Sequence, residues 1–303
     1  MRVGSLATNK NWPHRRQPYT PKAAVPSRTR FGLKRLRKDP ASIPIFLALL
    51  VASGVMLYPF GFMLLNSLRS QSQYLSGSGF STASWSALFS YLPVGRELLN
   101  SALVCAASIA IILTVSSSAG FAFAKLNFRG QGALFVTVIG CMMVPLQSII
   151  IPEYVNFAHV HLINTYLGAI LVYAGLGTPF ATFLMMTFYR GLPEELVEAA
   201  VCDGLGYEST FWRVALPLAK PALATVAVLQ FIQIWDDLLV GLLFLQEPTN
   251  RTITVGLGVL SSGRVVAIPE LMAGSLISAL PAVIVYLIFQ RYLVAGLTLG
   301  VNR

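Results

Sequence analysis

The chain has few charged residues. They make up 11% of its 303 residues, while 55% of the residues are hydrophobic. Soluble domains carry roughly 25% charged residues, and a soluble enzyme of this length would need a charged exterior. The shortfall excludes an ordinary soluble domain and favours a chain whose solvent is a lipid bilayer.

The sequence also lacks the residues of a metal or nucleotide site. Its few cysteines and histidines are scattered without metal-ligand spacing: Cys105, Cys141, Cys202, His14, His159 and His161. The pattern G-x-x-x-x-G-K-[ST] is absent, and no lysine is followed by Ser or Thr. A loop that cradles the phosphates of ATP is therefore missing. We expect a chain that is not an enzyme and that holds no cofactor and no metal.

Positive charge is concentrated at the N-terminus. The net charge is +10, and eleven of the 22 Lys and Arg residues lie between Arg2 and Lys38. The same stretch is rich in proline and poor in acid, which predicts a basic disordered tail over residues 1–40. A nucleic-acid-binding arm is one interpretation, but contact with anionic lipid headgroups is the plainer one. We expect membrane lipids, and no nucleic acid, as partners.

Long apolar runs fill the rest of the sequence. Six of them have about the 20 residues that cross roughly 30 Å of hydrocarbon. They lie near residues 43–66, 98–122, 133–156, 165–189, 219–245 and 271–293. The first is too long for a signal-peptide core and lacks a small-residue cleavage site, so it should remain as an anchor. The prediction is an all-α, polytopic membrane domain over residues 41–303.

The basic residues also predict the orientation of this domain. If the N-terminus is cytoplasmic, that side receives 18 Lys and Arg residues, and the other side receives only Arg69, Arg96, Arg251 and Arg264. An excess of positive charge marks cytoplasmic segments. Six spans then place both termini in the cytoplasm.

Proline occurs within several predicted spans, at Pro59, Pro145, Pro152, Pro179 and Pro281. A proline removes one backbone donor and tends to kink a helix. Kinked helices suit a translocation pathway, but static membrane proteins contain them as well. The proline pattern leaves both interpretations open.

One polar segment, residues 190–218, interrupts the apolar runs on the cytoplasmic side. Pro193 suits the first turn of a helix whose positive end lies near Glu194, Glu195 and Glu198. Gly204 follows where that helix should stop, because glycine reaches positive φ at little steric cost. This half of the segment predicts a short amphipathic helix.

A second short helix is predicted from about Tyr207 to Val214, with Pro217 ending it. The product would be a helix-turn-helix lying flat on the membrane face, with Phe211 and Trp212 available as anchors. An ordinary interfacial amphipathic helix, held by its aromatic residues and Arg213, would share this composition. The residue pattern alone does not distinguish this helix-turn-helix from an ordinary interfacial helix.

The segment resembles the cytoplasmic coupling loop of ABC-importer permeases. The likeness is carried by Leu192–Ala200 (Leu-Pro-Glu-Glu-Leu-Val-Glu-Ala-Ala), Asp203-Gly204, Phe211, Leu216-Pro217 and Pro221. Further landmarks are similar: Asn100-Ser101, Ala122-Phe123-Ala124, Phe128-Arg129-Gly130, Met143–Gln147, Pro152, Trp235, Gly256-Leu257 and Gln290–Gly300. The resemblance covers roughly residue 43 to the end. It is similar to the maltose-type carbohydrate branch, and to the smaller of that branch's two permeases.

This resemblance implies a type I ABC-importer permease fold with six transmembrane helices in the bacterial plasma (inner) membrane. It also implies a second permease that completes a heterodimer, two copies of a cytoplasmic ABC ATPase, and an extracytoplasmic solute-binding protein. The cargo implied is a sugar: an oligosaccharide, a disaccharide or a related solute. ATP and Mg would bind to the ATPase rather than to this chain.

In that family the loop docks into a cleft on the ATPase and transmits its closure. The resemblance therefore implies these coupling residues: Glu194, Glu195, Glu198, Ala199, Ala200, Asp203, Gly204, Phe211, Leu216 and Pro217. It also implies that the C-terminal tail, with Gly296, Leu297, Thr298 and Gly300, reaches toward the ATPase dimer. Two positions depart from the family's pattern, Cys202 in place of an aliphatic residue and Asp236 in place of a common asparagine.

Two acidic residues follow Trp235 in the outer part of the fifth predicted span. A carboxylate within a membrane usually faces a wet cavity or a partner. Asp236 and Asp237 could accept hydrogen bonds from sugar hydroxyls, with Trp235 as a stacking face, and Asp236 is the favoured pathway residue. The other interpretation is a carboxylate at the membrane edge that pairs with a companion subunit.

Two further function classes remain open at this point. An ion- or proton-coupled secondary transporter could use Asp236 and Asp237 as its binding sites, but it would leave the cytoplasmic hairpin without a role. A non-transporting scaffold could use the basic tail to bind lipid or nucleic acid. The permease hypothesis predicts that uptake survives deletion of residues 1–38.

Overall fold

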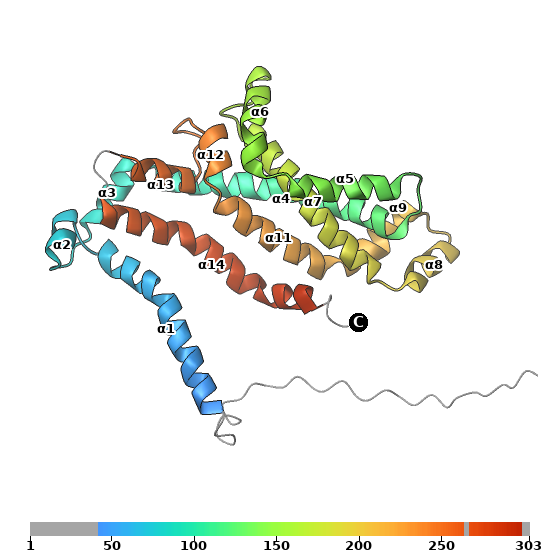
Figure 1. Ribbon diagram of the computed structural model, residues 1–303, viewed down its shortest axis with the longest axis horizontal. Helices are drawn as coiled ribbons and strands as arrows, with labels where there is room; N and C mark the ends of the chain where they lie inside the picture. The colour runs from blue at the N-terminus through green and yellow to red at the C-terminus, as the bar shows by residue number, and fades with distance from the viewer. Residues whose placement is uncertain (1–41, 264–266, 299–303) are drawn as a thin grey trace, which may run out of the picture. The chain divides into compact units, whose positions relative to one another are not determined.

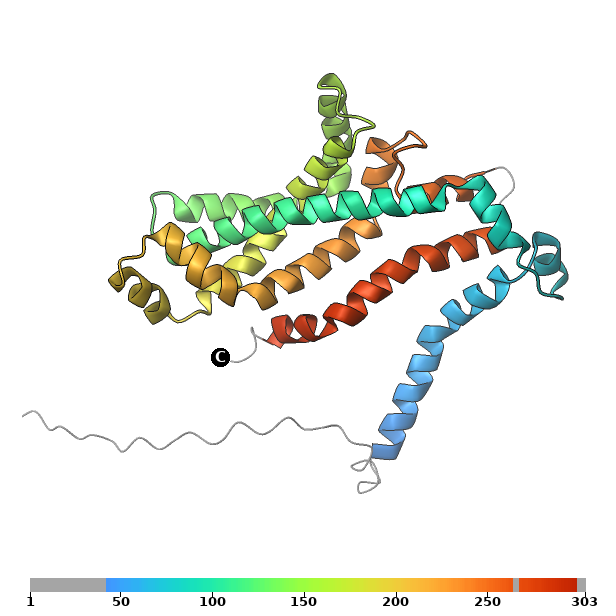
Figure 2. The same ribbon diagram turned by 180° about the vertical axis from the view of Figure 1, so that it is seen from behind.

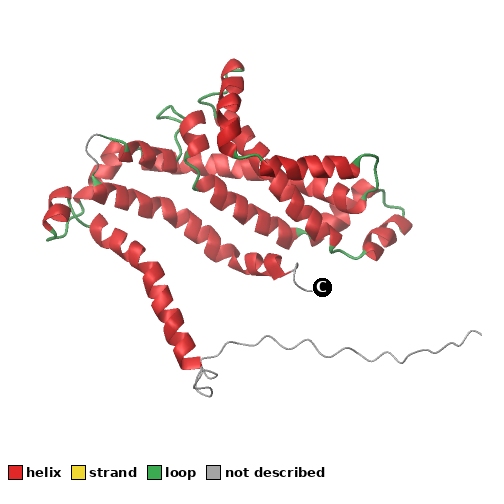
Figure 3. Ribbon diagram, viewed as in Figure 1, coloured by secondary structure: helices red, strands yellow, loops and turns green. Residues whose placement is uncertain are grey.

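The computed structural model is built from helices alone over the residues that it describes, 42–263 and 267–298 (Figure 3). Side chains are described as far as Arg291. The all-α prediction is confirmed over these ranges. The predicted tail over residues 1–40 and the tail residue Gly300 lie outside the described residues.

Two compact units divide the chain, Met1–Met56 and Leu57–Arg303, and the helix α1 (Ser42–Ser67) contains the boundary. The first unit contributes the apolar first half of α1. All of the packing and the sites that follow belong to the second unit.

Four helices of the described chain are long and apolar enough to cross a membrane. They are α1, α4 (Val94–Lys125), α7 (Tyr166–Arg190) and α14 (Ile268–Thr298). They coincide with the first, second, fourth and sixth predicted spans. The number of spans rises to six if each of two sharply bent helix pairs counts as one span.

The third predicted span, residues 133–156, is a broken helix. It consists of α5 (Gln131–Met143) and α6 (Leu146–His159), which meet at a bend of 98°. The break has a local cause, because the residue before a proline is disfavoured in the helical region. Val144 accordingly has an extended conformation, with φ −79° and ψ 117°, just before Pro145. As a result α5 lies along α7, whereas α6 points away from α5 and packs against α12 through Tyr154 and Phe157 (Figure 1).

The fifth predicted span, residues 219–245, is also divided. The helix α11 (Lys220–Trp235) ends at Asp236, and the short helix α12 (Leu239–Phe244) follows. Asp237 lies between the two helices, and its Oδ1 accepts the backbone N–H of Val240 at 2.8 Å. A carboxylate that accepts an amide hydrogen bond at a helix start stabilises that start. The span therefore ends in a polar corner rather than in a continuous helix.

The centre of the second unit is the pair of helices α4 and α7 (Figures 1 and 2). A Cβ added at Gly120 would lie 2.7 Å from Cβ of Met185 and 2.8 Å from the backbone nitrogen of Met186. Only glycine permits so close an approach, and small residues play this role at membrane helix interfaces. Close by, the hydroxyls of Ser117 and Tyr189 form a buried hydrogen bond of 2.8 Å.

The polar segments 67–97 and 246–270, which follow the first and fifth predicted spans, contain helices. These are α2 (Gln71–Ser76), α3 (Ala83–Tyr91) and α13 (Ile253–Ser261), together with the first turns of α4 and α14. Their polar composition is compatible with short helices, because capped helices use Ser, Thr and Gly at their ends. Ser70, for example, makes a capping box with Gln73 at the start of α2.

Asn100 and Ser101 on α4 hold the chain that leads into α13. The Asn100 amide donates hydrogen bonds to the carbonyl oxygens of Thr249 and Arg251 at 3.1 and 2.8 Å. The hydroxyl of Ser101 accepts the N–H of Ile253 at 2.9 Å, and Tyr166 at the start of α7 donates to Oδ1 of Asn100 at 2.8 Å. Side chains of α4 thus pair with backbone groups of the segment before α13 and with the start of α7.

The contact at Gly120 generates a stability prediction. We expect Gly120→Val to destabilise the bundle by about 1–3 kcal/mol, because the new side chain must displace the α7 backbone. Gly175→Val is the matched control, since nothing lies within 4 Å of a Cβ added at Gly175 on α7. Heating each variant in detergent and measuring the remaining monodisperse protein tests this. Equal heat resistance of the two variants would contradict the packing account.

Candidate coupling hairpin and transport cavity

The hairpin predicted over residues 190–218 occupies one end of the second unit. It begins with α8 (Glu194–Cys202) and continues through α9 (Tyr207–Thr210), a π-helical turn (Phe211–Ala215) and α10 (Leu216–Leu218). Figure 1 shows α8 and α9 beside the last turns of α4 and α7, at the opposite end from α3 and α13. The hairpin is thus attached to the end of the central helix pair.

The end of α8 follows the sequence prediction closely. Gly204 has φ +83°, the left-handed conformation that favours glycine. The N–H of Leu205 donates to the carbonyl of Ala200, and the N–H of Gly204 donates to that of Val201, both at 3.0 Å. This pair of bonds is the Schellman arrangement that closes a helix C-terminus. Gly204 therefore sets the sharp turn between the two arms of the hairpin.

The second arm is longer than predicted. Helical structure runs from Tyr207 to Leu218, so Pro217 does not end it. The π-helical turn before Pro217 supplies the reason, because a proline lacks an N–H and crowds the preceding turn of an α-helix. The widened turn accommodates that proline, and the N–H of Leu216 bonds instead to the carbonyl of Phe211. The chain bends by 72° between α10 and α11.

One face of the hairpin is packed against the bundle. Phe211 is 7% exposed, and its ring centroid lies 5.3 Å from that of Phe121 on α4. Phe121 in turn makes an edge contact with Tyr189 on α7 at 5.6 Å. The ammonium group of Lys125, the last residue of α4, donates to the carbonyl oxygen of Leu192 at 2.7 Å. Aromatic packing and one charged hydrogen bond thus connect the hairpin to both central helices.

The opposite face of the hairpin is exposed and mixed in character. Most of the predicted coupling residues lie on it: Glu194, Glu195, Glu198, Ala199, Asp203, Gly204 and Pro217. Trp212, 55% exposed, and the exposed Leu196 and Val201 add apolar surface. The other predicted coupling residues differ, since Ala200 and Phe211 are buried and Leu216 is half-buried. Of the two predicted aromatic anchors, Phe211 holds the hairpin and Trp212 is presented outward.

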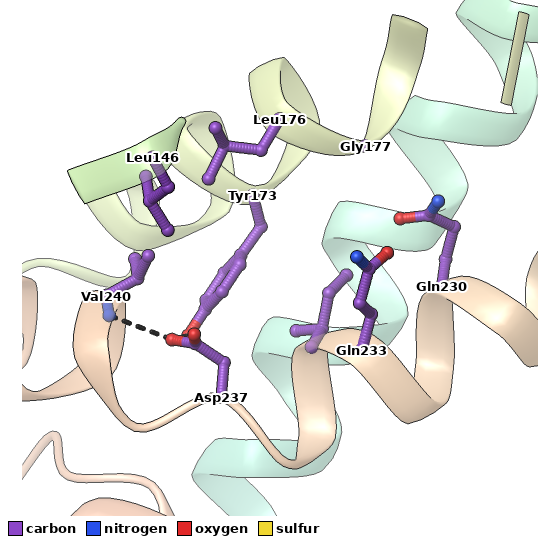
Figure 4. Close-up of a pocket in the computed structure, with 9 residues that line it drawn as sticks. Leu146, Tyr173, Leu176, Gly177, Gln230, Gln233, Asp237 and Val240 are labelled. Atoms are coloured by element: carbon purple, nitrogen blue, oxygen red, sulfur yellow. Dashed lines mark hydrogen bonds between the residues drawn. The ribbon is translucent and has the colours of Figure 1, made fainter. Parts of the chain in front are cut away.

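A second feature is a partly open cavity of about 220 Å³ between α7, α11 and α12, with Leu146 of α6 at its rim (Figure 4). Its lining is aliphatic apart from four polar side chains. The lining residues are Leu146, Leu176, Gly177, Ile234, Val240, Tyr173, Gln230, Gln233 and Asp237. A mostly apolar pocket with a few placed polar groups has the character of a small-molecule site.

The polar groups of the cavity have a defined arrangement. Tyr173 points across the cavity at Asp237, and its hydroxyl donates to Oδ1 of Asp237 at 2.9 Å (Figure 4). Gln230 is 1% exposed, and its Nε2 has no hydrogen-bond partner within the described part of the chain. Gln233 is exposed. Gln230 and Gln233 occupy positions i and i+3 near the end of α11, a spacing that places them on one helix face, and Asp237 follows just beyond that helix.

The three predicted pathway residues have different surroundings. Asp237 lines the cavity, whereas Asp236 is exposed and is not part of the lining. Trp235 is buried, its indole N–H donates to the carbonyl of Ser278 on α14 at 2.9 Å, and its ring stacks on Phe231. Trp235 therefore joins α11 to α14 and presents no free face to the cavity.

Several residues of these sites were not predicted from sequence. Tyr173 and Gly177 come from α7, and no local pattern indicates that they face α11. The spacing of Gln230, Gln233 and Asp237 could have been found, since polar residues at i, i+3 and i+7 stand out in an apolar helix. The anchoring roles of Lys125 and Phe121 depend on a contact across more than 60 residues of sequence, which spacing does not reveal.

Two remaining predictions concern the C-terminus and metals. Gly296, Leu297 and Thr298 belong to the last turns of α14, so the predicted tail is helical up to Thr298. Within residues 42–263 and 267–298, no three side chains of His, Cys, Asp or Glu gather in a way that could hold a metal ion.

Comparisons with known proteins agree with the hairpin and the helical architecture. Residues 114–298 match the family described as binding-protein-dependent transport system inner membrane component. The osmoprotective compounds uptake permease protein GgtD of Synechocystis is 32% identical, over 85% of this chain and 91% of that relative. The arabinooligosaccharides transport system permease protein AraQ of Halalkalibacterium halodurans is 33% identical, over 66% of this chain and 71% of the length of that relative.

A solved structure shows the same fold. One chain in the crystal structure of a bacterial ABC transporter involved in the import of the acidic polysaccharide alginate superimposes with a TM-score of 0.71. The match covers 87% of this chain and 99% of that one at 21% sequence identity. With an exposed hairpin anchored to a bundle of membrane-length helices, this chain belongs to the family of binding-protein-dependent transport system inner membrane components, the multi-pass permease subunits of ABC importers.

Proposed function

We propose that this chain is one half of a heterodimeric permease that imports a sugar, with the hairpin of residues 190–218 as its contact to two copies of a cytoplasmic ATPase. An extracytoplasmic solute-binding protein would deliver the cargo. The observation that carries this proposal is the two-faced hairpin, whose buried face packs against α4 and α7 and whose outer face exposes acidic and apolar side chains. A hairpin of this kind can transmit movement to the bundle only if another protein binds its exposed face.

The distribution of charge supports a cytoplasmic position for the hairpin. Lys125 ends α4, Arg190 ends α7 and Lys220 begins α11, all at the hairpin end, where Arg213 of the hairpin also lies. Positive residues that flank spans mark the cytoplasmic side. With the hairpin in the cytoplasm, an even number of spans on each side of it would place both termini there as well.

The proposed mechanism is a shift between two arrangements of the bundle. Closure of the ATPases would pull the hairpin, and the contacts of Phe211 and Lys125 would carry that motion to α4 and α7. The break at Pro145 divides the third span, and the break at Ala219 separates the hairpin from α11, so these segments can tilt separately. ATP would stabilise one arrangement because the ATPases bind the hairpin differently in each. ATP and Mg would bind on those partner subunits, and this chain would carry out no chemistry.

A sugar cargo is supported by the cavity and by one of the relatives. The cavity offers hydroxyl, carboxylate and amide groups among aliphatic side chains, a combination that suits a solute with many hydroxyls and few charges. The name of the relative AraQ refers to arabinooligosaccharides. We infer an oligosaccharide, a disaccharide or a related solute for this chain.

Gly204 provides a test of the hairpin. Threonine at φ +83° is strongly disfavoured, because β-branched residues rarely adopt positive φ. We expect Gly204→Thr to distort the turn and to reduce copurification of the ATPase by about tenfold, which corresponds to about 1.4 kcal/mol of binding free energy. Gly206→Thr is the control, since Gly206 has φ −69° and is the N-cap residue of α9, a position that accepts threonine. Undiminished ATPase recovery with Gly204→Thr would remove the hairpin from the interface.

Lys125 provides a test of the connection between hairpin and bundle. Lys125→Met removes the hydrogen bond to Leu192 but keeps an apolar stem of similar length. We expect ATP hydrolysis to continue while solute taken up per ATP falls severalfold, because a hydrogen bond to a charged group contributes about 1.5–3 kcal/mol. Lys220→Met, an exposed lysine at the same end, should leave this ratio unchanged. Identical ratios in the two variants would refute the assigned role of Lys125.

The energy source distinguishes this proposal from an ion-coupled transporter that uses Asp236 and Asp237. We expect uptake by proteoliposomes containing the whole assembly to stop when ATP is omitted from the ATPase side. We also expect it to continue when ionophores collapse the ion gradients. Uptake that follows the ion gradient and ignores ATP would support the ion-coupled mechanism instead.

A further inference from the structure

Arg190 brings a positive charge to the hairpin end of α7 that no described acidic residue neutralises. It is the last residue of α7, and its side chain is exposed. Glu194 and Glu195 follow at the start of α8, but within the described part of the chain neither forms an ion pair with it. The N–H donors of Arg190 are therefore available to an anion from outside the chain.

Aromatic rings hold the guanidinium of Arg190 in place. Its Cζ lies over the ring of Phe135 on α5, 5.9 Å from the ring centroid. Phe135 in turn makes an edge contact of 5.7 Å with Phe123 of α4, which is buried. A guanidinium that rests on an aromatic face keeps its N–H edge free, and this edge matches the paired oxygens of a phosphate. Arg190 is thus oriented for an oxyanion before one binds.

The surface of α7 next to Arg190 is suited to a hydrocarbon chain. Phe183, Thr187 and Arg190 occupy positions i, i+4 and i+7, which share one helix face, and all three are exposed. The hydroxyl of Thr187 already donates to the carbonyl oxygen of Phe183 at 2.9 Å. This face therefore offers apolar surface and no unsatisfied polar group below the charge of Arg190.

The helix α5 borders the same region. It runs beside α7, and its Phe135 reaches the guanidinium of Arg190 (Figure 1). A cation at the end of the junction between two helices, with apolar surface leading away from it, combines two binding surfaces of opposite character. An inorganic anion would use only the first of them.

The membrane setting identifies a molecule that uses both surfaces. The helix α7 is long and apolar enough to span a bilayer, so its outward apolar face meets lipid chains and its end lies at the level of the headgroups. Basic sites between membrane helices attract anionic headgroups. Arginine also forms paired hydrogen bonds to phosphate that a neutral headgroup does not strengthen.

We propose that Arg190, Phe135 and the α7 face of Phe183 and Thr187 form a binding site for one anionic phospholipid. The lipid phosphate accepts hydrogen bonds from Arg190, and an acyl chain lies along Phe183 and Thr187. The bound lipid would join α5 to α7 directly beside the hairpin. This site is separate from the path of the cargo and does not depend on which solute is imported.

The test is a lipid titration of the complete importer, purified in a neutral detergent and freed of its lipids. Mass spectrometry of the intact complex counts the bound lipids. The probes are dioleoylphosphatidylglycerol, which is anionic, and dioleoylphosphatidylcholine, which has no net charge. Glycerol 1-phosphate serves as a competitor, because it carries a phosphate but no acyl chain.

Three variants separate the charge from the apolar face. Arg190→Gln removes the charge, and Thr187→Phe fills the face but leaves Arg190 in place. Lys220→Gln is the matched control, since Lys220 is another exposed cation at the hairpin end, at the start of α11. The positions altered are all exposed, so none of these changes disturbs the packed interior.

We expect the unaltered importer and Lys220→Gln to bind one phosphatidylglycerol at least about tenfold more tightly than phosphatidylcholine. Arg190→Gln should weaken the binding of phosphatidylglycerol by about tenfold, because a hydrogen bond to a charged group is lost. Thr187→Phe should weaken it severalfold. An excess of glycerol 1-phosphate should not displace the lipid.

Several results would overturn the lipid site. One is equal affinity of Arg190→Gln and Lys220→Gln for phosphatidylglycerol, and another is equal affinity of the unaltered importer for the two lipids. Displacement by glycerol 1-phosphate would reduce the site to an anion site without a role for the acyl chain. If position 187 crosslinks to the second permease in the assembled importer, that face is a subunit contact and the lipid proposal is wrong. Because binding is measured without transport, each of these results leaves the proposed import function standing.

Discussion

The close packing of α4 against α7 is the constraint on which both sites depend. Gly120 lets the two backbones approach near the hairpin, and Gly177 does the same for α7 and Gln230 near the cavity. In a bilayer, lipid tails are as apolar as the side chains of a helix, so apolar contact alone does not favour helix association. Close packing and buried hydrogen bonds must hold the helices together. The bond between Ser117 and Tyr189 is one of these. Larger residues at the two glycines would push α7 away from α4 and α11.

This arrangement links the two sites mechanically. Tyr173 at the cavity and Arg190 at the hairpin lie on the same helix, about 25 Å apart at 1.5 Å per residue. At the hairpin end, Phe121 packs between Phe211 and Tyr189, so a displacement of the hairpin presses on α4 and α7 together. Because α7 contacts the hairpin at one end and lines the cavity further along, a movement of the hairpin reaches the cavity through one continuous helix.

Local chemistry made some features predictable, and packing between distant segments determined the rest. Gly204 was predicted because a glycine after an amphipathic helix has one common use. The break at Pro145 was not, since a proline in an apolar run is compatible with a kink or with a 98° bend. Pro217 misled for the same reason, because a π-helical turn relieves its clash. Whether Asp236 or Asp237 borders the cavity depends on where α11 ends, and in the structure it is Asp237 that lines it. Tyr173 and Lys125 act across long sequence separations that no local pattern encodes.

Cys202 allows the most direct test of the proposal that the hairpin is the contact to the ATPase. Cys202 ends α8 and is exposed, and Cys105 is buried, so Cys141→Ser leaves one accessible thiol among the described cysteines. The measurement is the rate at which a membrane-impermeant maleimide labels Cys202 in inverted membrane vesicles, with and without added ATPase subunits. Our account predicts labelling from the cytoplasmic side that slows markedly when the ATPase is bound. Labelling in intact cells from outside, or a rate that ignores the ATPase, would contradict it.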